Sequence, residues 1–258
     1  RAAGASLPFH LEIDTGMGRF GLGWQDAERR AGEVAELLSF GGLRLRGTLT
    51  HFHSADTSCE QTTAQWRRFQ AALDALRTAG VDTGFVHAAN SAAALRYEEY
   101  SADLVRPGIR LYGGGRWEPS GRPVVAVRAR VLDVREVEAG ATVSYGATWS
   151  SPDAARLATI GIGYGDGLRR ELSNRGRLLI HGRSAPIRGV VCMDSTVVEL
   201  GERDDVQPGD VAPVLGQDHG MEIGLDELAE LCGTIDYEIL TGWSRRLPRI
   251  EIHGRSGR

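Results

Sequence analysis

Residues 9–19, Phe-His-Leu-Glu-Ile-Asp-Thr-Gly-Met-Gly-Arg, place a strand-like apolar segment directly before a glycine-rich turn. The strand-like part ends at Ile13, and the turn begins at Asp14. Apolar residues at helical spacing follow over residues 26–40. This order of strand, polar turn and helix predicts a βαβ-type unit. Its repetition along the chain predicts right-handed crossovers around a parallel sheet.

The same order repeats as far as Arg122. Further strands are expected at residues 43–51, 84–88 and 104–106, and helices at residues 61–79 and 90–95. After Pro123 the pattern changes to short strands separated by turn residues, which is typical of an all-β fold. Those strands are expected at residues 124–137, 142–149, 156–163, 177–181, 185–191, 196–200 and 210–215, with one helix at residues 225–232.

The stretch of residues 114–123 is rich in glycine and proline and is the expected boundary between two domains. We therefore expect an α/β domain over residues 1–122 and a mostly antiparallel β domain over residues 123–258.

The composition argues against several classes of function. A net charge of −4 gives no basic surface for nucleic acid. No apolar run approaches the roughly 20 residues that span a bilayer. Cys59, Cys192 and Cys232 lack metal-ligand spacing and form no disulfide framework. We therefore expect a protein of the reducing cytoplasm, with no metal and with neither a nucleic-acid nor a membrane partner.

Polar or glycine-rich motifs follow four of the expected strands in the α/β domain. They are residues 14–19, Thr50-His51-Phe52, Asn90-Ser91 and Arg106-Pro107-Gly108. In a parallel α/β barrel the functional groups gather at the carboxyl ends of the strands. Each motif also has a purely structural interpretation, which is a glycine turn, a core histidine, a helix N-cap and a strand-to-loop turn respectively.

The β domain contains further candidate residues. Tyr145 stands beside a glycine, Tyr164 lies in a glycine-rich run, Met193-Asp194 follow an apolar strand, and Tyr237 lies near the C-terminus. A tyrosine packed on a sheet, a glycine turn and a buried thioether are the structural alternatives. We exclude a dinucleotide loop at the glycine-rich run because no βα unit follows it.

Taken together and in order, these motifs resemble the alanine racemase family over about residues 10–250. The resembling stretches are HLEIDTGMGRFG, THFHSAD, HAANSAAALR, VRPGIRLYG, VSYGATW, IGYGDGLRR, VVCMDS and TIDYEIL. Each stretch is weak alone, but eight in the same order make a chance match very improbable.

The resemblance implies a (β/α)8 barrel of the TIM type that binds pyridoxal 5'-phosphate, followed by a β domain. It also implies a head-to-tail homodimer that interconverts L-alanine and D-alanine for peptidoglycan. In the family, a lysine on the first barrel strand holds the cofactor as a Schiff base. All 30 Lys+Arg residues here are arginines, and the first residue is Arg1. We therefore expect this chain to comprise the C-terminal half of the barrel and the β domain, without the lysine strand, and to be inactive alone.

The resemblance assigns cofactor-binding roles. His51 would stack against the pyridine ring, and Arg106 would donate a hydrogen bond to the pyridine nitrogen. Because a guanidinium keeps its proton, the ring nitrogen would stay unprotonated and the ring would be a weaker electron sink. The phosphate would be held by Ser91, Gly108, Ile109 and Tyr237.

The resemblance also assigns substrate-binding and catalytic roles. Arg19 would bind the substrate carboxylate through a charge-assisted hydrogen bond. Tyr145, acting in the partner's site, would be one of two bases, and Met193 would line the partner's substrate site. Tyrosine has an ordinary pKa of about 10 and needs nearby cations to act as a base. Tyr164 and Asp194 would support these groups.

Two other interpretations stay open. The chain could belong to a racemase of serine or of several amino acids in the same family. It could also be a non-catalytic short form that keeps the β domain for dimerisation. An upstream coding sequence with a strand followed by a lysine would distinguish an enzyme from the short form.

Glu12 departs from the family pattern, which often has at this position a lysine that becomes carbamylated and supports the substrate-binding arginine. A carbamate and a carboxylate are both anions, so we hypothesise that Glu12 orients Arg19 directly or through water. In the complete enzyme, Glu12→Gln should therefore raise the KM for alanine. An unchanged KM would contradict this role.

Overall fold

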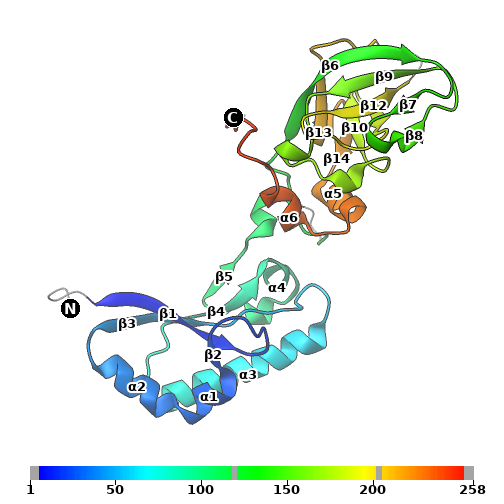
Figure 1. The fold of residues 1–258 in the computed structure, drawn as a ribbon. Helices are drawn as coiled ribbons and strands as arrows, with labels where there is room; N and C mark the ends of the chain where they lie inside the picture. The colour runs from blue at the N-terminus through cyan, green and yellow to red at the C-terminus, as the bar shows by residue number, and fades with distance from the viewer. Residues whose placement is uncertain (1–5, 118–120, 202–204, 253–258) are drawn as a thin grey trace. The chain divides into compact units, whose positions relative to one another are not determined.

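The computed structural model describes residues 6–117, 121–201 and 205–252. The chain divides into two compact units (Figure 1). The α/β unit comprises Arg1–Leu111 and Trp117–Ser120, and the β unit comprises Tyr112–Arg116 and Gly121–Arg258. Among the described helices, none is both long enough and apolar enough to cross a lipid bilayer.

A five-stranded parallel sheet forms the centre of the α/β unit, with strand order β2-β1-β3-β4-β5. Its strands are β1 (Leu7–Asp14), β2 (Leu22–Gly23), β3 (Leu43–Leu49), β4 (Phe85–Asn90) and β5 (Leu104–Arg106). The helices are α1 (Trp24–Arg29), α2 (Ala31–Ser39), α3 (Cys59–Thr78) and α4 (Ser91–Arg96). Figure 1 shows α1, α2 and α3 along one face of the sheet. The predicted parallel sheet with alternating helices is confirmed.

The helix predicted over residues 26–40 is in fact two helices. Arg30 leaves the helical region with φ −114° and ψ 17°, and it separates α1 from α2. Ala27 and Ala31 are both buried on either side of the break. The apolar spacing therefore continues through the break, and periodicity alone does not reveal it.

Helix α3 agrees with its predicted position, but its buried face differs in one respect. Its N-cap is Ser58, whose side chain accepts a hydrogen bond from the Gln61 amide. Phe69, Leu73 and Leu76, which recur at helical spacing, are buried. A polar residue, Gln65, is also fully buried on this face, and it becomes important at the strand ends described below.

The β unit contains a five-stranded antiparallel sheet of order β12-β9-β6-β13-β14 and two separate hairpins. The sheet strands are β6 (Val127–Val137), β9 (Ala155–Ile160), β12 (Thr196–Leu200), β13 (Val211–Asp218) and β14 (Met221–Ile223). The hairpins pair β7 (Thr142–Val143) with β8 (Trp149–Ser150) and β10 (Arg177–Ile180) with β11 (Arg183–Pro186). Two helices, α5 (Leu225–Cys232) and α6 (Asp236–Thr241), follow β14.

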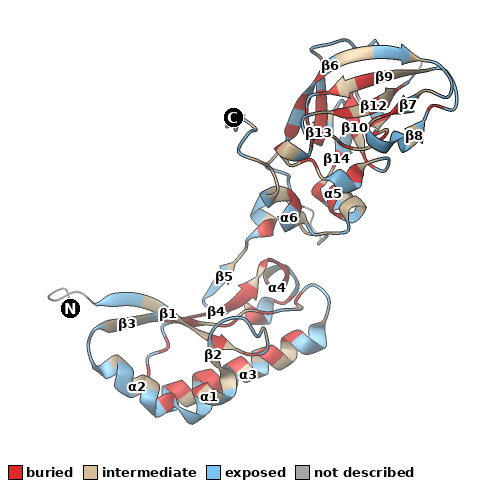
Figure 2. Cartoon of the chain, in the orientation of Figure 1, coloured by how far each residue is buried: buried red, intermediate tan, exposed pale blue. Residues whose placement is uncertain are grey.

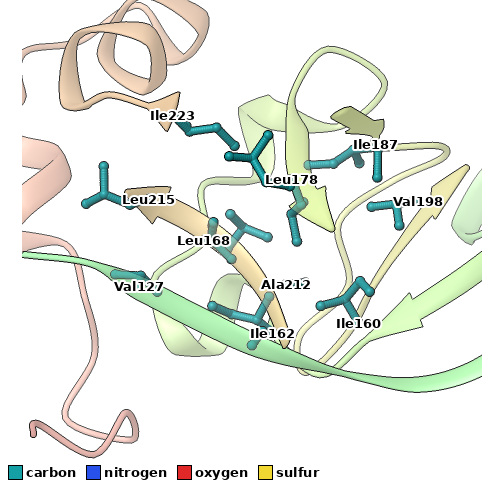
Figure 3. Close-up of a cluster of buried hydrophobic side chains, with 14 of the residues drawn as sticks. Val127, Ile160, Ile162, Leu168, Leu178, Ile187, Val198, Ala212, Leu215 and Ile223 are labelled. Atoms are coloured by element: carbon teal, nitrogen blue, oxygen red, sulfur yellow. The ribbon is translucent and has the colours of Figure 1, made fainter. Parts of the chain in front are cut away.

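Side chains from several strands of the β unit meet in one core (Figure 3). Ile160, Leu178, Val198 and Leu215 come from β9, β10, β12 and β13, and each is almost fully buried. Figure 2 colours each residue by its burial and shows buried positions on the strands and exposed positions on the loops. The predicted all-β character of this half is confirmed.

Two expected strands of the β unit were wrong in detail, and two further elements were missed. The strand expected at residues 142–149 is a short hairpin, because Ser144, Gly146 and Ala147 adopt positive φ and turn the chain back. The strand expected at residues 185–191 ends at Pro186. Strand β14 and helix α6 were not predicted at all.

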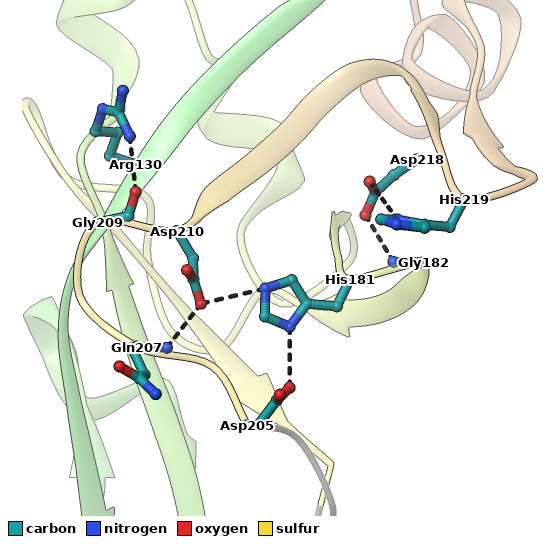
Figure 4. A network of polar contacts seen from close by, with 9 residues as sticks. All are labelled: Arg130, His181, Gly182, Asp205, Gln207, Gly209, Asp210, Asp218 and His219. Carbon is teal, nitrogen blue, oxygen red and sulfur yellow. Dashed lines mark hydrogen bonds and ion pairs between the residues drawn. The ribbon is translucent and has the colours of Figure 1, made fainter.

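Two tight hairpin turns lie against each other in the β unit (Figure 4). His181-Gly182 joins β10 to β11 with φ 51° and 72°, and His219-Gly220 joins β13 to β14 with φ 46° and 86°. Positive φ at both central residues is the type I′ geometry that suits the twist of a hairpin. The Gly182 amide donates to Asp218 Oδ2 at 2.7 Å, which links the two turns.

The His181 ring adds a second link in this region. Its Nδ1 lies 3.2 Å from Asp205 Oδ1, and its Nε2 lies 3.2 Å from Asp210 Oδ2 (Figure 4). Asp210 Oδ2 also accepts a hydrogen bond from the Gln207 amide at 2.8 Å. The β10–β11 turn is thereby tied to the loop that precedes β13.

The contact between the two turns can be tested with a matched pair of substitutions. A Cβ at Gly182 would lie 2.7 Å from the His219 Cβ, whereas a Cβ at Gly220 would meet nothing within 4 Å. Both positions have positive φ, so both alanine variants carry the backbone cost of about 1 kcal/mol. We expect Gly182→Ala to cost roughly 2 kcal/mol or more, because the methyl group also clashes. Hydrogen exchange of the β13 amides would measure the stability cost of each variant. Equal costs for Gly182→Ala and Gly220→Ala would contradict the contact between the two turns.

Candidate functional site

Arg106, the last residue of β5, lies at the centre of the polar groups at the strand ends. Its Nη1 donates to His87 Nδ1 at 2.6 Å, and its Nη2 donates to the carbonyl oxygens of Thr50 and Ala88 at 2.8 and 3.3 Å. Burial lowers the pKa of Arg106, and the negative charge of Glu12 opposes that effect. A guanidinium has so high an ordinary pKa that it stays charged.

The donors of Arg106 fix the protons of two histidines. Because a guanidinium only donates, His87 Nδ1 must accept, so the His87 proton resides on Nε2. His87 Nε2 lies 2.7 Å from His10 Nδ1 and therefore donates to it. His87 is buried, and its pKa is lowered to about 4 by burial and by the neighbouring Arg106 and His10. His87 is thus a neutral link between Arg106 and His10.

Gly47 makes room for this chain of rings. A Cβ on Gly47 would lie 2.7 Å from the His10 ring and 2.5 Å from the Phe85 carbonyl oxygen. Neither His10 nor His87 was identified from the sequence, because both stand inside predicted strands and look like ordinary strand residues. The only signal was that both fall within the family-like stretches HLEID and HAANS.

His51 follows β3 and is half-buried beside the same arginine. Its pKa is lowered first by burial and then by the charges of Arg106 and Arg19, which favours the neutral imidazole. Its carbonyl oxygen accepts from Gln65 Nε2 at 3.0 Å, and Gln65 Oε1 accepts from the His53 amide at 3.0 Å. Gln65, which the sequence did not point to, therefore clamps the backbone on both sides of Phe52.

Gln65 also ties β3 to the turn after β1. Its Nε2 donates to Thr15 Oγ1 at 3.1 Å, and Thr15 Oγ1 lies 2.7 Å from Thr50 Oγ1. From the next turn of α3, Arg68 donates to the Thr15 carbonyl oxygen at 2.9 Å. The ends of β1 and β3 are thus held together by side chains of one helix.

The turn that presents Arg19 is organised by Asp14. The Asp14 carboxylate accepts from the amides of Gly16 at 2.9 Å and Gly18 at 3.1 Å. Partial burial raises the pKa of Asp14, but hydrogen bonds from these amides outweigh it, and the net shift is downward. Arg19 itself is exposed, with its guanidinium 5.8 Å from the Phe20 ring centroid. Within the described residues Glu12 makes no hydrogen bond or ion pair with Arg19, so that link stays a prediction.

Ser91, Gly108 and Ile109 come together at the ends of β4 and β5. Ser91 Oγ accepts from the amides of Gly108 at 2.8 Å and Arg110 at 3.5 Å. Asn90 is the N-cap of α4, since its Oδ1 accepts from the Ala93 amide at 3.1 Å. The N-cap interpretation therefore holds for Asn90, while the Ser91 hydroxyl faces backbone amides of the type that hold phosphates.

The remaining candidates belong to the β unit. Tyr145 is 74% exposed on a one-turn 3-10 helix, Tyr145–Ala147, between β7 and β8. Tyr237 lies on α6 and is half-exposed. The structure thus assigns the predicted cofactor and substrate residues to two separate units, and their individual roles stay predictions.

Tyr164, Met193 and Asp194 are neighbours within the β unit. The Tyr164 amide donates to the Cys192 carbonyl oxygen and the Gly165 amide to the Met193 carbonyl oxygen, each at 2.9 Å. Arg246 contacts Asp194 Oδ1 at 2.5 Å and Asp166 Oδ1 at 3.3 Å, which ties the C-terminal segment to both loops. Across the described parts of the chain, His, Cys, Asp and Glu side chains form no group of three that could hold a metal ion.

Comparison with known proteins gives one consistent family. The family model for the alanine racemase N-terminal domain matches residues 1–115, and that for the C-terminal domain matches residues 124–251. The alanine racemase of Desulfosudis oleivorans is 39% identical over 268 residues, which cover 99% of this chain and 69% of that protein. The alanine racemase of Carboxydothermus hydrogenoformans is 42% identical over 254 residues, which cover 96% of this chain and 68% of that protein.

Solved structures agree. The alanine racemase of Streptomyces lavendulae matches with a TM-score of 0.92 at 34% identity, covering 98% of this chain and 68% of that one. The alanine racemase of Bartonella henselae, solved with covalently bound pyridoxal phosphate, matches with a TM-score of 0.82 at 33% identity, covering 95% and 66%. The chain therefore spans about two thirds of the length of the relatives it matches.

The buried His87 gives the fold a dependence on pH. Its folded pKa of about 4 lies below the ordinary 6.5, so the unfolded chain takes up a proton that the folded chain refuses. Stability from this source is complete above pH 6.5 and is lost as pH falls toward 4. Between pH 8 and pH 5 we expect a loss on the order of 2 kcal/mol. Chemical denaturation at both pH values should show a smaller loss in His87→Gln, and equal losses would contradict this assignment.

Proposed function

Because this chain belongs to the alanine racemase family, a family of enzymes that depend on pyridoxal phosphate, we propose that it forms the cofactor pocket and supplies one proton-transferring residue of an alanine racemase. The reaction would interconvert L-alanine and D-alanine in the cytoplasm and provide D-alanine for peptidoglycan. The observation that carries this proposal is the Arg106 guanidinium, which His87 and the carbonyl oxygens of Thr50 and Ala88 hold at the strand ends.

The residues at the strand ends fit pyridoxal phosphate. Three of the five N–H groups of Arg106 are used by His87, Thr50 and Ala88. Among the described residues, its Nε and its second Nη1 hydrogen have no acceptor, so both are free for a pyridine nitrogen. A Cβ on Gly108 would meet nothing within 4 Å, which leaves room for an anion beside the Ser91 hydroxyl.

Each of these groups would do a distinct part of the work. When bound, the cofactor supplies an electron sink for the pair left when the substrate Cα loses its proton. Arg106 would donate to the pyridine nitrogen without giving up its proton, and this favours plain proton exchange over deeper electron withdrawal. His51, neutral at ordinary pH, would cover the ring face. The phosphate would be held by Ser91, Gly108, Ile109 and Tyr237.

Racemisation needs a proton removed from one face of Cα and returned to the other. Tyr145, acting in the partner's site of a homodimer, would be the group on one face, and Met193 would line that site. Arg19 would hold the substrate carboxylate by a charge-assisted hydrogen bond, with Glu12 supporting it through water. Tyr164 and Asp194 would fix the loop that presents Met193. We further propose that the parallel sheet of the α/β unit is one arc of the family's barrel.

The group on the other face would be the lysine that holds the cofactor. No lysine occurs in these 258 residues, so none of their side chains offers an amine for a Schiff base. We use the word holoenzyme for these residues together with a segment that supplies the lysine and with bound pyridoxal phosphate.

Racemase assays of both forms test this function. We expect the 258 residues with pyridoxal phosphate to racemise no alanine, and borohydride reduction to attach no cofactor to a side chain. The holoenzyme should racemise alanine, and Tyr145→Phe should lower its kcat by about 10² to 10⁴. Racemase activity in the 258 residues alone, or full activity of the Tyr145→Phe holoenzyme, would contradict the proposal.

A further inference from the structure

The turn that carries Tyr145 is strained. Ser144, Gly146 and Ala147 all have positive φ, at 65°, 71° and 48°, and two of them are not glycine. Non-glycine residues adopt such angles only where surrounding contacts hold them there. The hairpin of β7 and β8 has only two residues in each strand, so its own ladder is a weak support for this conformation.

One exposed side chain joins this turn to the body of the β unit. Asn174 Nδ2 donates to Thr148 Oγ1 at 3.0 Å, and Thr148 is the residue that ends the tyrosine turn. Asn174 Oδ1 accepts from the Gly189 amide at 2.6 Å. The two ends of one amide therefore bridge the tyrosine turn and the segment after β11.

The geometry around Asn174 favours this bridge. Asn174 has φ 58°, a left-handed conformation that asparagine tolerates better than most residues. Its neighbour Ser173 accepts from the Val191 amide at 3.0 Å. The consecutive side chains of Ser173 and Asn174 thus accept hydrogen bonds from the amides of Val191 and Gly189. Segments 172–176 and 187–191 are thereby joined along their length.

The segment after β11 also supports the other end of the turn. Ser144 Oγ donates to the Val190 carbonyl oxygen at 2.6 Å. A Cβ on Gly189 would lie 2.6 Å from the Val143 carbonyl oxygen and 2.8 Å from the Ser144 Cβ, so the two backbones are in close contact. Ser144 thus fixes the start of the turn and Asn174 its end, with Tyr145 between them.

We propose that Asn174 is a positioning residue for Tyr145, which it serves through Thr148 without touching substrate or cofactor. The proposal rests on the proposed role of Tyr145 in proton transfer. A proton-transferring group must lie within hydrogen-bond reach of its target, and a displacement of about 1 Å can cost 10²-fold in rate. Tyr145 is exposed and receives little support from its own packing, so its position depends on the two ends of its turn.

Three variants separate the contacts of Asn174. Asn174→Gly removes both hydrogen bonds while keeping a residue that accepts positive φ. Thr148→Val removes only the bond to the turn. Thr142→Val is the matched control, since Thr142 lies exposed in the same hairpin and its side chain makes no hydrogen bond to the described residues.

Hydrogen exchange on the purified 258 residues gives a test that needs no activity. The Gly189 amide should exchange about tenfold faster in Asn174→Gly, in keeping with the loss of one hydrogen bond, and at the ordinary rate in Thr148→Val. The Ala147 amide donates to the Ser144 carbonyl oxygen at 3.2 Å. It should exchange faster in both variants but not in Thr142→Val. An unchanged Ala147 rate in Asn174→Gly would overturn the proposal.

Isotope effects in the holoenzyme distinguish positioning from general loosening. With Cα-deuterated alanine, a displaced Tyr145 slows proton removal from one enantiomer, so the substrate isotope effect for that enantiomer should rise. For the other enantiomer Tyr145 returns the proton, so the substrate isotope effect should fall. We expect Asn174→Gly and Thr148→Val to lower kcat about 5- to 50-fold with this opposed pattern, and Thr142→Val to leave both unchanged.

The outcomes for the two proposals are separate. Equal changes of the isotope effect for both enantiomers, or an unchanged kcat in Asn174→Gly, would overturn the positioning role even if Tyr145→Phe is inactive. Full activity of Tyr145→Phe would instead overturn the proposed function of Tyr145, while the exchange data would still report whether Asn174 holds the turn.

Discussion

The polar edge of the α/β unit depends on one chemical property of Arg106, which is that its guanidinium can donate hydrogen bonds but cannot accept them. Every group around it must therefore offer an acceptor. The carbonyl oxygens of Thr50 and Ala88 do so, and their contacts join the ends of β3, β4 and β5. His87 does so through Nδ1, and this choice determines the proton position of His10. A single fixed charge thus sets the direction of a hydrogen-bond chain across three strands.

The β unit obtains its order differently, from backbone geometry. Its loops depend on positive φ at paired turn residues. They also depend on side chains that accept hydrogen bonds from backbone amides, such as Asp218 from Gly182 and Asn174 from Gly189. Such contacts orient exposed residues, because an exposed side chain has little packing of its own to hold it. In this way Ser144 and Thr148, on either side of the three-quarters exposed Tyr145, are both bonded to the body of the β unit.

The sequence was sufficient for the elements that repeat and for the motifs at their ends. Alternation of strands and helices gave the parallel sheet, and the strand ends gave His51, Ser91 and Arg106. It was insufficient where the deciding partner is distant in the chain. Gln65 lies on an apolar helix face and acts 14 residues away on the His51 carbonyl. His10 and His87 pair across 77 residues. The residues around Tyr145 predict a strand, because the pattern of apolar residues carries no information about the sign of φ.

Helix α3 is the common support of two strand ends. Gln65 donates hydrogen bonds to the His51 carbonyl oxygen and the Thr15 hydroxyl, and Arg68 donates to the Thr15 carbonyl oxygen. The turn that carries Arg19 and the loop that carries His51 are therefore both attached to α3. A small translation of α3 along its axis would carry both loops with it. The distance between His51, which we propose lines the cofactor pocket, and Arg19, which we propose binds the substrate, would therefore change little in such a motion.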